Sequence, residues 1–438
     1  MSALARYFKS KGAVVSGYDR TPSALTAELQ SEGIDIHFVD NPDLIPDDTT
    51  LVIYTPAVPK SLKEYQYIES KGIEIRKRAE ILGEISAEYN TIAVAGTHGK
   101  TTVSTMITWL LKNSEIKCNA ILGGISKNLS SNVLLSEDAG ILVTEADEYD
   151  RSFLRLQPDF AVITSADADH LDIYNDKSNL LDSFSQFAEK VKPGGTLLIK
   201  RSAGLNFNSK DYKIYSYSLD GKADFYAVNI RLSDDKYTFD LVTPDGIIKN
   251  LTPGIPGLIN LENSVAALAT ALLYGADEDE LREALPDFKG IKRRFDYQIR
   301  SGKIIYIDDY AHHPVEIQGV LNSVKSLYPE KKTLVIFQPH LYSRTRDFAE
   351  DFAESLDLAD EVILLPIYPA RELPVDGVSS EMILKRMTNE HKLLMEKSDI
   401  PGRLGEFDFD IIITLGAGDI DRLVKPVKEF LMQKKSQV

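Results

Sequence analysis

A short glycine-containing stretch, GTHGKTT at 96–102, has the residue types that bind the phosphates of a nucleotide. It stands between an apolar run at 92–95 and a helical repeat of apolar residues that ends at Leu111. Glycines let the backbone come close to an anion, and free N–H groups at a helix start point toward it. The pattern predicts a phosphate-binding loop made of Gly96, Thr97, His98, Gly99, Lys100, Thr101 and Thr102.

Two residues of this loop have the chemistry for a Mg²⁺–triphosphate. Lys100 would reach the terminal phosphates, and the hydroxyl of Thr101 would bind the metal. The general loop pattern has a glycine at the position that Val94 occupies in this chain. An ordinary strand, glycine turn and helix is therefore the alternative interpretation, although the flanking elements favour nucleotide binding.

Acidic residues follow two further predicted strands, as EADEYD at 145–150 and ADADH at 166–170. Mg²⁺ takes oxygen ligands and rarely gets all six from protein, so one carboxylate beside phosphates and waters is enough. We expect Glu145 to be that carboxylate and His170 to bind or orient a second ion. A solvated loop position is the alternative for the remaining acids, Asp147, Glu148, Asp150 and Asp167.

Further polar groups lie in the second half of the chain. Asn260 and Asn263 stand one turn apart near a predicted helix at 264–274, where they would cap the helix or face a base edge. DDYAHHP at 308–314 and QPHLYSRTR at 338–346 each follow a predicted strand. Because ligands of open α/β sheets bind at the carboxyl ends of strands, we expect binding residues there, with scattered surface side chains as the alternative.

The elements that must position these groups alternate between strand and helix. A small α/β segment precedes the loop, and polar–apolar alternation over 212–252 indicates antiparallel strands with turns at 220–221 and 245–246. Strands and helices then alternate up to a last helix from Asp421. The fold class predicted is α/β, with a parallel, doubly wound sheet in the C-terminal part.

The composition of the 438-residue chain limits its class of function. A hydrophobic fraction of 43% with 26% charged residues is typical of globular proteins. The net charge of −16 argues against nucleic acid and against an anionic membrane surface as partners. Cys118 is the single cysteine, which excludes an internal disulfide. We expect a cytoplasmic monomer or homodimer without a membrane span.

Six motifs, in chain order, resemble those of the Mur ligase family: GTHGKTT at 96–102, EADEYD at 145–150, DH at 169–170, GIKRRF at 290–295, DDYAHHP at 308–314 and QPHLYSRTR at 338–346. The resemblance covers almost the whole chain and implies three domains. These are a Rossmann-like UDP-substrate-binding domain at 1–88, a central P-loop ATPase-like domain at 89–292 and a C-terminal Rossmann-like ligase domain at 293–438. The first strand and Gly-rich turn of the family are not found ahead of the first helix, so we expect a truncated, incomplete N-terminal domain.

The resemblance is strongest to the branch that joins L-alanine to UDP-N-acetylmuramate in peptidoglycan synthesis. It implies ATP and Mg²⁺ as cofactors, an acyl-phosphate intermediate, and these two molecules as substrates. By the same resemblance, Lys100 meets the β- and γ-phosphates, and Thr101, Glu145 and His170 hold magnesium. Asn260 and Asn263 match paired asparagines near adenine, Arg294 an arginine at the nucleotide, and Asp309 an acid near the ribose.

Tyr310, His312 and Arg344 fall where the family handles the carboxylate end of UDP-muramate. The catalytic set implied is Lys100, Glu145, His170, His312 and Arg344. The chain departs from the family at Ile259, where a histidine is usual, and at Leu341, which is often arginine. Ser183 and Ser185 stand where several other Mur ligases carry a carbamylated lysine, and this branch of the family is expected to have no lysine there.

Three other functions are alternatives to this one. The nearest is the recycling ligase that adds a tripeptide to UDP-N-acetylmuramate, which shares the GTHGKT and EADEYD patterns. A regulatory P-loop switch would leave the ordered substrate motifs unexplained. A Rossmann dehydrogenase would need a Gly-x-Gly-x-x-Gly motif after a strand, which this sequence does not contain.

Overall fold

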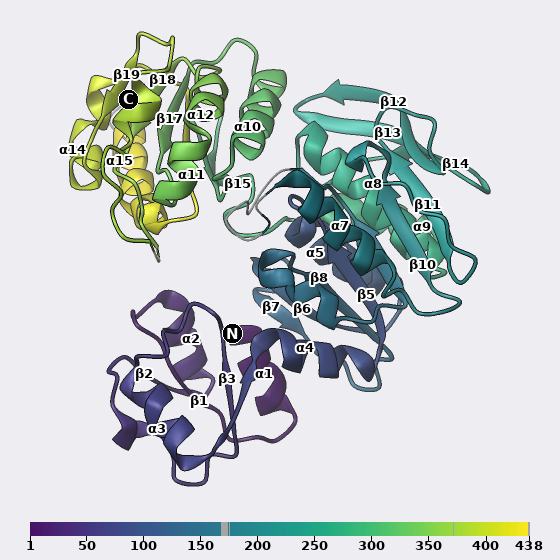
Figure 1. The fold of residues 1–438 in the computed structure, drawn as a ribbon. Helices are drawn as coiled ribbons and strands as arrows, with labels where there is room; N and C mark the ends of the chain where they lie inside the picture. The colour runs from purple at the N-terminus through teal and green to yellow at the C-terminus, as the bar shows by residue number, and fades with distance from the viewer. Residues whose placement is uncertain (168–173, 175, 371, 437–438) are drawn as a thin grey trace. The chain divides into compact units, whose positions relative to one another are not determined.

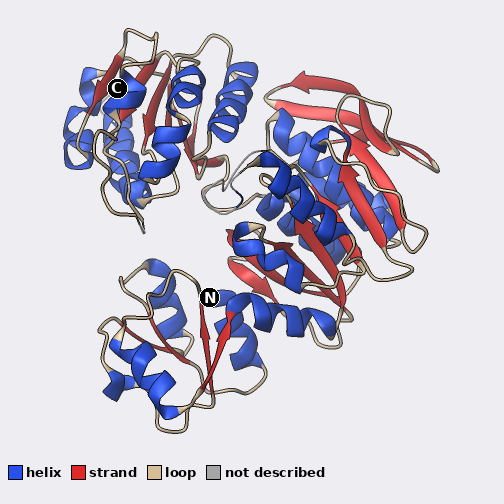
Figure 2. Cartoon of the chain, viewed as in Figure 1, coloured by secondary structure: helices blue, strands red, loops and turns tan. Residues whose placement is uncertain are grey.

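The computed structural model describes residues 1–167, 174, 176–370 and 372–436 (Figure 1). The chain divides into two compact units: Met1–Tyr226 with Val265–Ala284, and Ala227–Ser264 with the chain from residue 285 onward. Strands and helices alternate in both units (Figure 2). Within the described ranges, every helix is too short or too polar to cross a lipid bilayer.

The first part of unit 1 is a small α/β region with two separate pairs of parallel strands. β1 (Ser16–Tyr18) pairs with β2 (Asp35–His37), and β3 (Leu51–Tyr54) pairs with β4 (Glu74–Lys77). The α/β prediction for this region is confirmed, but the four strands do not join into one sheet. The apolar face of the first helix is buried in the core of the unit. The helices are α1 (Ser2–Ser10), α2 (Ala24–Ser31), α3 (Lys63–Lys71) and α4 (Arg78–Ala87).

The remainder of unit 1 is organised around strands in the order β7-β6-β8-β5-β9-β10-β11. Neighbouring strands are parallel except β6 and β7. Because β8, β5 and β9 are parallel neighbours, their carboxyl ends lie side by side. The strands are β5 (Asn90–Ala95), β6 (Cys118–Ser126), β7 (Ser131–Leu134), β8 (Ile141–Ala146), β9 (Phe160–Ile163), β10 (Thr196–Lys200) and β11 (Lys213–Ser218).

The helix after the glycine loop, α5 (Lys100–Asn113), packs on β5, β6 and β8 (Figure 1). The predicted apolar repeat is confirmed, because all its members are fully buried: Val103, Met106, Ile107, Leu110 and Leu111. Burial of this face fixes the helix against the sheet, and it therefore fixes the position of the loop that begins it. The other helices of the unit include α7 (Lys177–Ala188) and α9 (Glu278–Ala284).

The prediction of antiparallel strands over 212–252 is only partly confirmed. β13 (Lys236–Thr243) and β14 (Gly246–Leu251) form an antiparallel hairpin around the predicted second turn. At the first turn the prediction is wrong, because β11 and the start of β12 (Phe225–Ser233) pair in parallel. Alternation of polar and apolar residues is the same in both kinds of strand pair, so the pattern could not give the direction.

Unit 2 contains a six-stranded sheet in the order β15-β16-β20-β17-β18-β19. The predicted parallel sheet is confirmed for β16, β20, β17 and β18. Two strands were not predicted: β19 extends the parallel sheet beside β18, and β15 adds an antiparallel edge beside β16. The strands are β15 (Asp296–Arg300), β16 (Ile305–Asp309), β17 (Thr333–Phe337), β18 (Glu361–Leu364), β19 (Lys392–Leu394) and β20 (Ile411–Leu415).

Helices cover both faces of this sheet (Figure 2). Leu334 and Ile336 share a core cluster with residues of the last two helices. Phe337, which points to the opposite face, packs on Phe352 with ring centroids 5.3 Å apart. The doubly wound arrangement is therefore confirmed. The helices are α10 (Pro314–Leu327), α11 (Tyr342–Asp347), α12 (Ala349–Leu356), α13 (Glu381–Leu384), α14 (Ile400–Arg403) and α15 (Val424–Ser436).

Candidate functional site

The loop between β5 and α5 takes a shape that depends on its two glycines. Gly96 has a φ of 138°, and Gly99, the residue that caps α5, has a φ of 84°. A Cβ atom on Gly96 would also lie 2.8 Å from the backbone nitrogen of Ser165. An L-residue at either position would be strained, and the loop brings the backbone at the helix start to the sheet edge as a phosphate site requires.

Hydroxyl groups at the end of β9 hold this loop in place. The backbone N–H of His98 donates to Ser165 Oγ at 2.7 Å, and Thr97 Oγ1 lies 2.9 Å from the same oxygen. Thr164 Oγ1 donates to the carbonyl oxygen of His98 at 2.5 Å. The sequence analysis did not single out these hydroxyls. The sequence feature that could have indicated them is the Thr164-Ser165 pair, which follows β9, the parallel neighbour of β5.

Lys100, predicted to meet phosphate, is held in the described structure by Glu148. Its Nζ donates to Glu148 Oε2 at 2.7 Å and Oε1 at 2.9 Å, and to the carbonyl oxygen of Gly96 at 2.7 Å. Burial alone would lower the pKa of Lys100, but the charges of Glu148 and Asp147 outweigh it and raise the pKa. The alternative of a solvated loop position is wrong for Glu148, whose side chain is 0% exposed.

Glu145, the predicted magnesium ligand, extends from β8 beside the loop strand. It pairs in register with Val94 of β5, and its Oε1 accepts the N–H of Gly123 at 2.7 Å. Glu145 and Thr101 are both half-buried, so water can reach them. A carboxylate and a hydroxyl are hard oxygen donors of the kind that Mg²⁺ prefers, so these residues fit the ion. His170, the other predicted ligand, lies outside the described residues, as does Asp169.

Gly123 is a further position on which this carboxylate depends. A Cβ there would lie 2.5–2.8 Å from the Glu145 carboxylate atoms, so Gly123→Ala should push the carboxylate aside. We expect activity to fall about 10- to 100-fold, with a higher Mg²⁺ requirement, because a displaced catalytic group loses its geometry. Measuring activity against Mg²⁺ concentration tests this. Gly140→Ala is the matched control, because a Cβ at Gly140 meets nothing within 4 Å, and equal loss in both variants would contradict the assignment.

In unit 2, a cluster of charged and aromatic side chains follows β16. The Tyr310 ring lies near two guanidinium groups, with the Cζ atoms of Arg293 and Arg294 at 5.1 Å and 5.0 Å from its centroid. His312 Nδ1 lies 3.0 Å from the carbonyl oxygen of Tyr310 and 3.1 Å from Glu316 Oε2. Glu316 also lies 3.5 Å from Arg294. The structure thus brings Arg294, Tyr310 and His312 together.

Asp309, predicted to lie near a ribose, uses both carboxylate oxygens for the backbone. Oδ2 accepts the N–H of Phe295 at 2.5 Å, and Oδ1 accepts the N–H of Ala311 at 2.7 Å. Burial raises the pKa of Asp309 to about 6, against the opposing charge of Arg294. These bonds tie the GIKRRF segment to the end of β16, a structural role that the sequence analysis did not anticipate.

The other predicted residues of unit 2 lie on helices. Arg344 is buried in α11, near the end of β17. The helix α8 (Leu258–Leu273) begins six residues before the predicted start, so Asn260 and Asn263 lie inside its first turns rather than ahead of it. Asn260 Nδ2 donates to the carbonyl oxygen of Pro256 at 2.6 Å, and Asn263 is 8% exposed.

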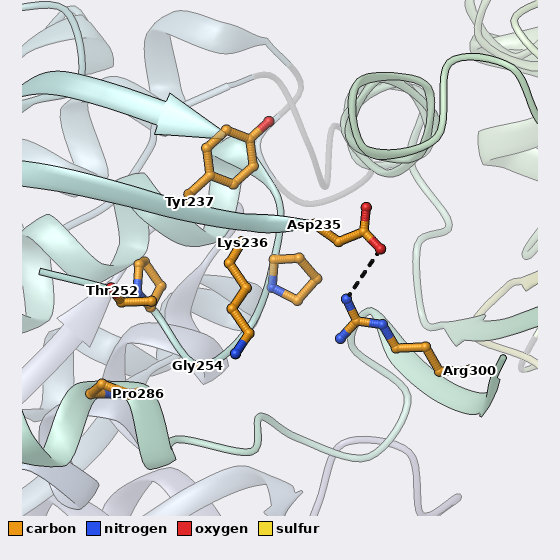
Figure 3. Close-up of a pocket in the computed structure, with 9 residues that line it drawn as sticks. Asp235, Lys236, Tyr237, Thr252, Gly254, Pro286 and Arg300 are labelled. Atoms are coloured by element: carbon orange, nitrogen blue, oxygen red, sulfur yellow. Dashed lines mark ion pairs between the residues drawn. The ribbon is translucent and has the colours of Figure 1, made fainter. Parts of the chain in front are cut away.

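A cavity of about 140 Å³ in unit 2 lies apart from these residues (Figure 3). Its lining includes none of the predicted site residues, and an ion pair of 3.7 Å between Asp235 and Arg300 crosses one side. Both partners are about two-fifths exposed, at 41% and 42%. Water therefore reaches this pair, and we assign no chemistry to the cavity.

Family models match three successive parts of the chain. The Mur ligase family, catalytic domain, matches residues 1–90, the Mur ligase middle domain matches 94–271, and the Mur ligase, glutamate ligase domain, matches 293–403. This result confirms the predicted α/β fold with three family domains.

Two relatives and one solved structure are similar over nearly the whole chain. A UDP-N-acetylmuramate–L-alanine ligase of Parabacteroides distasonis is 50% identical over 99% of this chain and 95% of the relative. The same enzyme of Christiangramia forsetii is 47% identical over 99% and 96%. The crystal structure of a UDP-N-acetylmuramate–alanine ligase from Thermotoga maritima has a TM-score of 0.83 and 26% identity, covering 100% of this chain and 97% of that chain.

Proposed function

Because this chain belongs to the Mur ligase family, we propose that it joins L-alanine to UDP-N-acetylmuramate at the expense of ATP. The observation that carries the substrate assignment is the high identity, over almost the full chain, to relatives named for these two substrates. The same observation favours L-alanine over the tripeptide of the recycling ligase.

The reaction requires that a carboxylate become reactive toward an amine. The γ-phosphoryl group of ATP passes to an oxygen of the lactyl carboxylate, which releases ADP and gives an acyl phosphate. The nitrogen of L-alanine then attacks the acyl carbon, the C–O bond to phosphate breaks, and the amine loses a proton. Bringing a carboxylate up to a polyanionic triphosphate is repulsive, so positioned positive charge is the main catalytic requirement.

The loop of unit 1 supplies this charge in our proposal. Lys100 lies against the β- and γ-phosphates, with the backbone of residues 96–102 around them. Thr101, Glu145 and His170 would hold Mg²⁺, which when bound neutralises phosphate charge. The hydrogen bonds from β9 to His98 support this role, because they fix the loop before a nucleotide arrives.

The residues of unit 2 complete the proposal. Asn260 and Asn263 would lie near the adenine, Arg294 at the nucleotide, and Asp309 near the ribose. His312 and Arg344 would bind the carboxylate end of UDP-N-acetylmuramate. The buried bonds of Asp309 to Phe295 and Ala311 suggest that it acts mainly by holding Arg294 and Tyr310 in place.

Phosphate release with defined substrates tests the proposal. We expect the purified chain to release phosphate only when ATP, Mg²⁺, UDP-N-acetylmuramate and L-alanine are all present. Replacing L-alanine by the tripeptide, or leaving out the amino acid, provides the controls. Faster release with the tripeptide would show that the chain is the recycling ligase instead.

A further inference from the structure

The bond between Lys100 and Glu148 is not accounted for by the proposed reaction. Glu148 is 0% exposed, and Lys100 is 16% exposed, so the pair lies almost entirely out of water. A buried carboxylate is costly unless it is paired and hydrogen-bonded. Here both of its oxygens lie on the ammonium of the one lysine that the phosphate loop provides.

The backbone around Glu148 is held in place independently of that bond. Tyr174, which is 0% exposed, donates from its hydroxyl to the carbonyl oxygen of Glu148 at 2.5 Å. Asp150 and Arg151, which follow, have left-handed φ values of 54° and 53°. Such conformations persist only where the surroundings determine them, and they gather at functional sites. The carboxylate is therefore presented to Lys100 by a fixed segment rather than by a mobile loop.

The arrangement leaves a simple route for a phosphate to bind. The ammonium has three hydrogens, and its three acceptors are the two oxygens of Glu148 and the carbonyl oxygen of Gly96. A phosphate oxygen can replace one oxygen of Glu148 while the other two contacts keep the nitrogen in position. The Lys100 ammonium would then bind the phosphate in the orientation that it already has.

We propose that Glu148 is a positioning residue that holds the Lys100 ammonium aimed along the phosphate loop. The inference rests on the proposed function only in taking a nucleotide phosphate as the ligand of Lys100. Removing the carboxylate would take away two of the three acceptors of the ammonium and leave the carbonyl oxygen of Gly96 to orient it. Glu148 therefore acts on the nucleotide through Lys100.

Glu148→Gln tests this, with Asp150→Asn as the matched control. Asp150 is exposed, carries the same charge two residues away, and its left-handed backbone suits asparagine. In the Gln variant we expect kcat to fall about 100-fold, as for a displaced catalytic group. We expect the KM for ATP to change little by comparison, because the amide oxygen of glutamine can still accept one hydrogen bond from the ammonium. Asp150→Asn should keep the kcat and the KM of the wild type.

An unchanged kcat in Glu148→Gln, or a fall in kcat matched by an equal rise in the KM for ATP, would overturn the inference. If that variant is too unstable for kinetics, melting temperatures of Lys100→Met, Glu148→Gln and the double variant decide instead. We expect the double variant to melt above Lys100→Met, because the buried carboxylate that lost its ion-pair partner in Lys100→Met is then absent. If the double variant lost as much melting temperature as the two single variants together, Lys100 and Glu148 would not be coupled and the inference would be rejected. If the wild type binds no ATP, the proposed function fails, and the melting comparison still judges the pair.

Discussion

Lys100→Ala is expected to lower ATP-dependent phosphate release by roughly 1,000-fold or more, because it removes the charge that opposes phosphate repulsion in the transition state. The lysine begins α5, directly after Gly99, whose left-handed φ of 84° caps the helix. Shortening it removes the ammonium but none of the apolar side chains that pack the helix on the sheet, which begin at Val103. Phosphate release with both substrates present is the measurement.

The structure adds a stability cost to this prediction. From the sequence we would expect the variant to keep its full stability, because Lys100 supports no core. The structure shows instead that Lys100 is the ion-pair partner of the fully buried Glu148, and breaking such a pair costs about 3–5 kcal/mol. Lys112→Ala, on the exposed last turn of the same helix, is the control. Near-normal phosphate release from a folded Lys100→Ala protein would show that the loop assignment is wrong.

The elements around the site could be predicted because their patterns are local. The apolar repeat of α5 and the strand before the glycine turn follow from spacing within about a dozen residues, and both are confirmed. The strand ends that carry Glu145 and the C-terminal motifs follow from the same reasoning. Neighbouring parallel strands have their carboxyl ends at the same edge of the sheet. Motifs that are far apart in sequence therefore lie close together within each sheet.

The hydrogen-bond and ion-pair partners of the site residues could not be predicted, because they depend on the strand register and on how deeply each side chain is buried. From the sequence alone, a solvated loop position is equally plausible for Glu148 and Asp150. Only the turn after β8 decides that the first is buried against Lys100 and the second is exposed. Likewise, no local pattern shows that both carboxylate oxygens of Asp309 accept hydrogen bonds from backbone N–H groups. The strand β15 was missed because its mixed polar sequence, DYQIR, resembles a linker.

Glu145→Gln is expected to lower activity by about 100- to 1,000-fold, because it keeps the size of the side chain but removes the charge that faces Mg²⁺. The bond to the Gly123 N–H should survive, since the amide oxygen of glutamine can accept it. The fold should therefore be preserved. Activity should recover in part at high Mg²⁺ concentration, because a weakened metal site can be filled by mass action.

The recovery with Mg²⁺ is what separates Glu145 from the other acids of its motif. Glu148→Gln should also lose activity, but through Lys100, so added Mg²⁺ should not restore it. Asp147→Asn is the matched control: Asp147 accepts the N–H of Tyr149 at 3.2 Å, and asparagine retains that acceptor. We expect its activity to change little. If Asp147→Asn lost as much activity as Glu145→Gln and recovered equally with Mg²⁺, the metal carboxylate would be Asp147, and the position of Glu145 over Gly123 would have to serve another purpose.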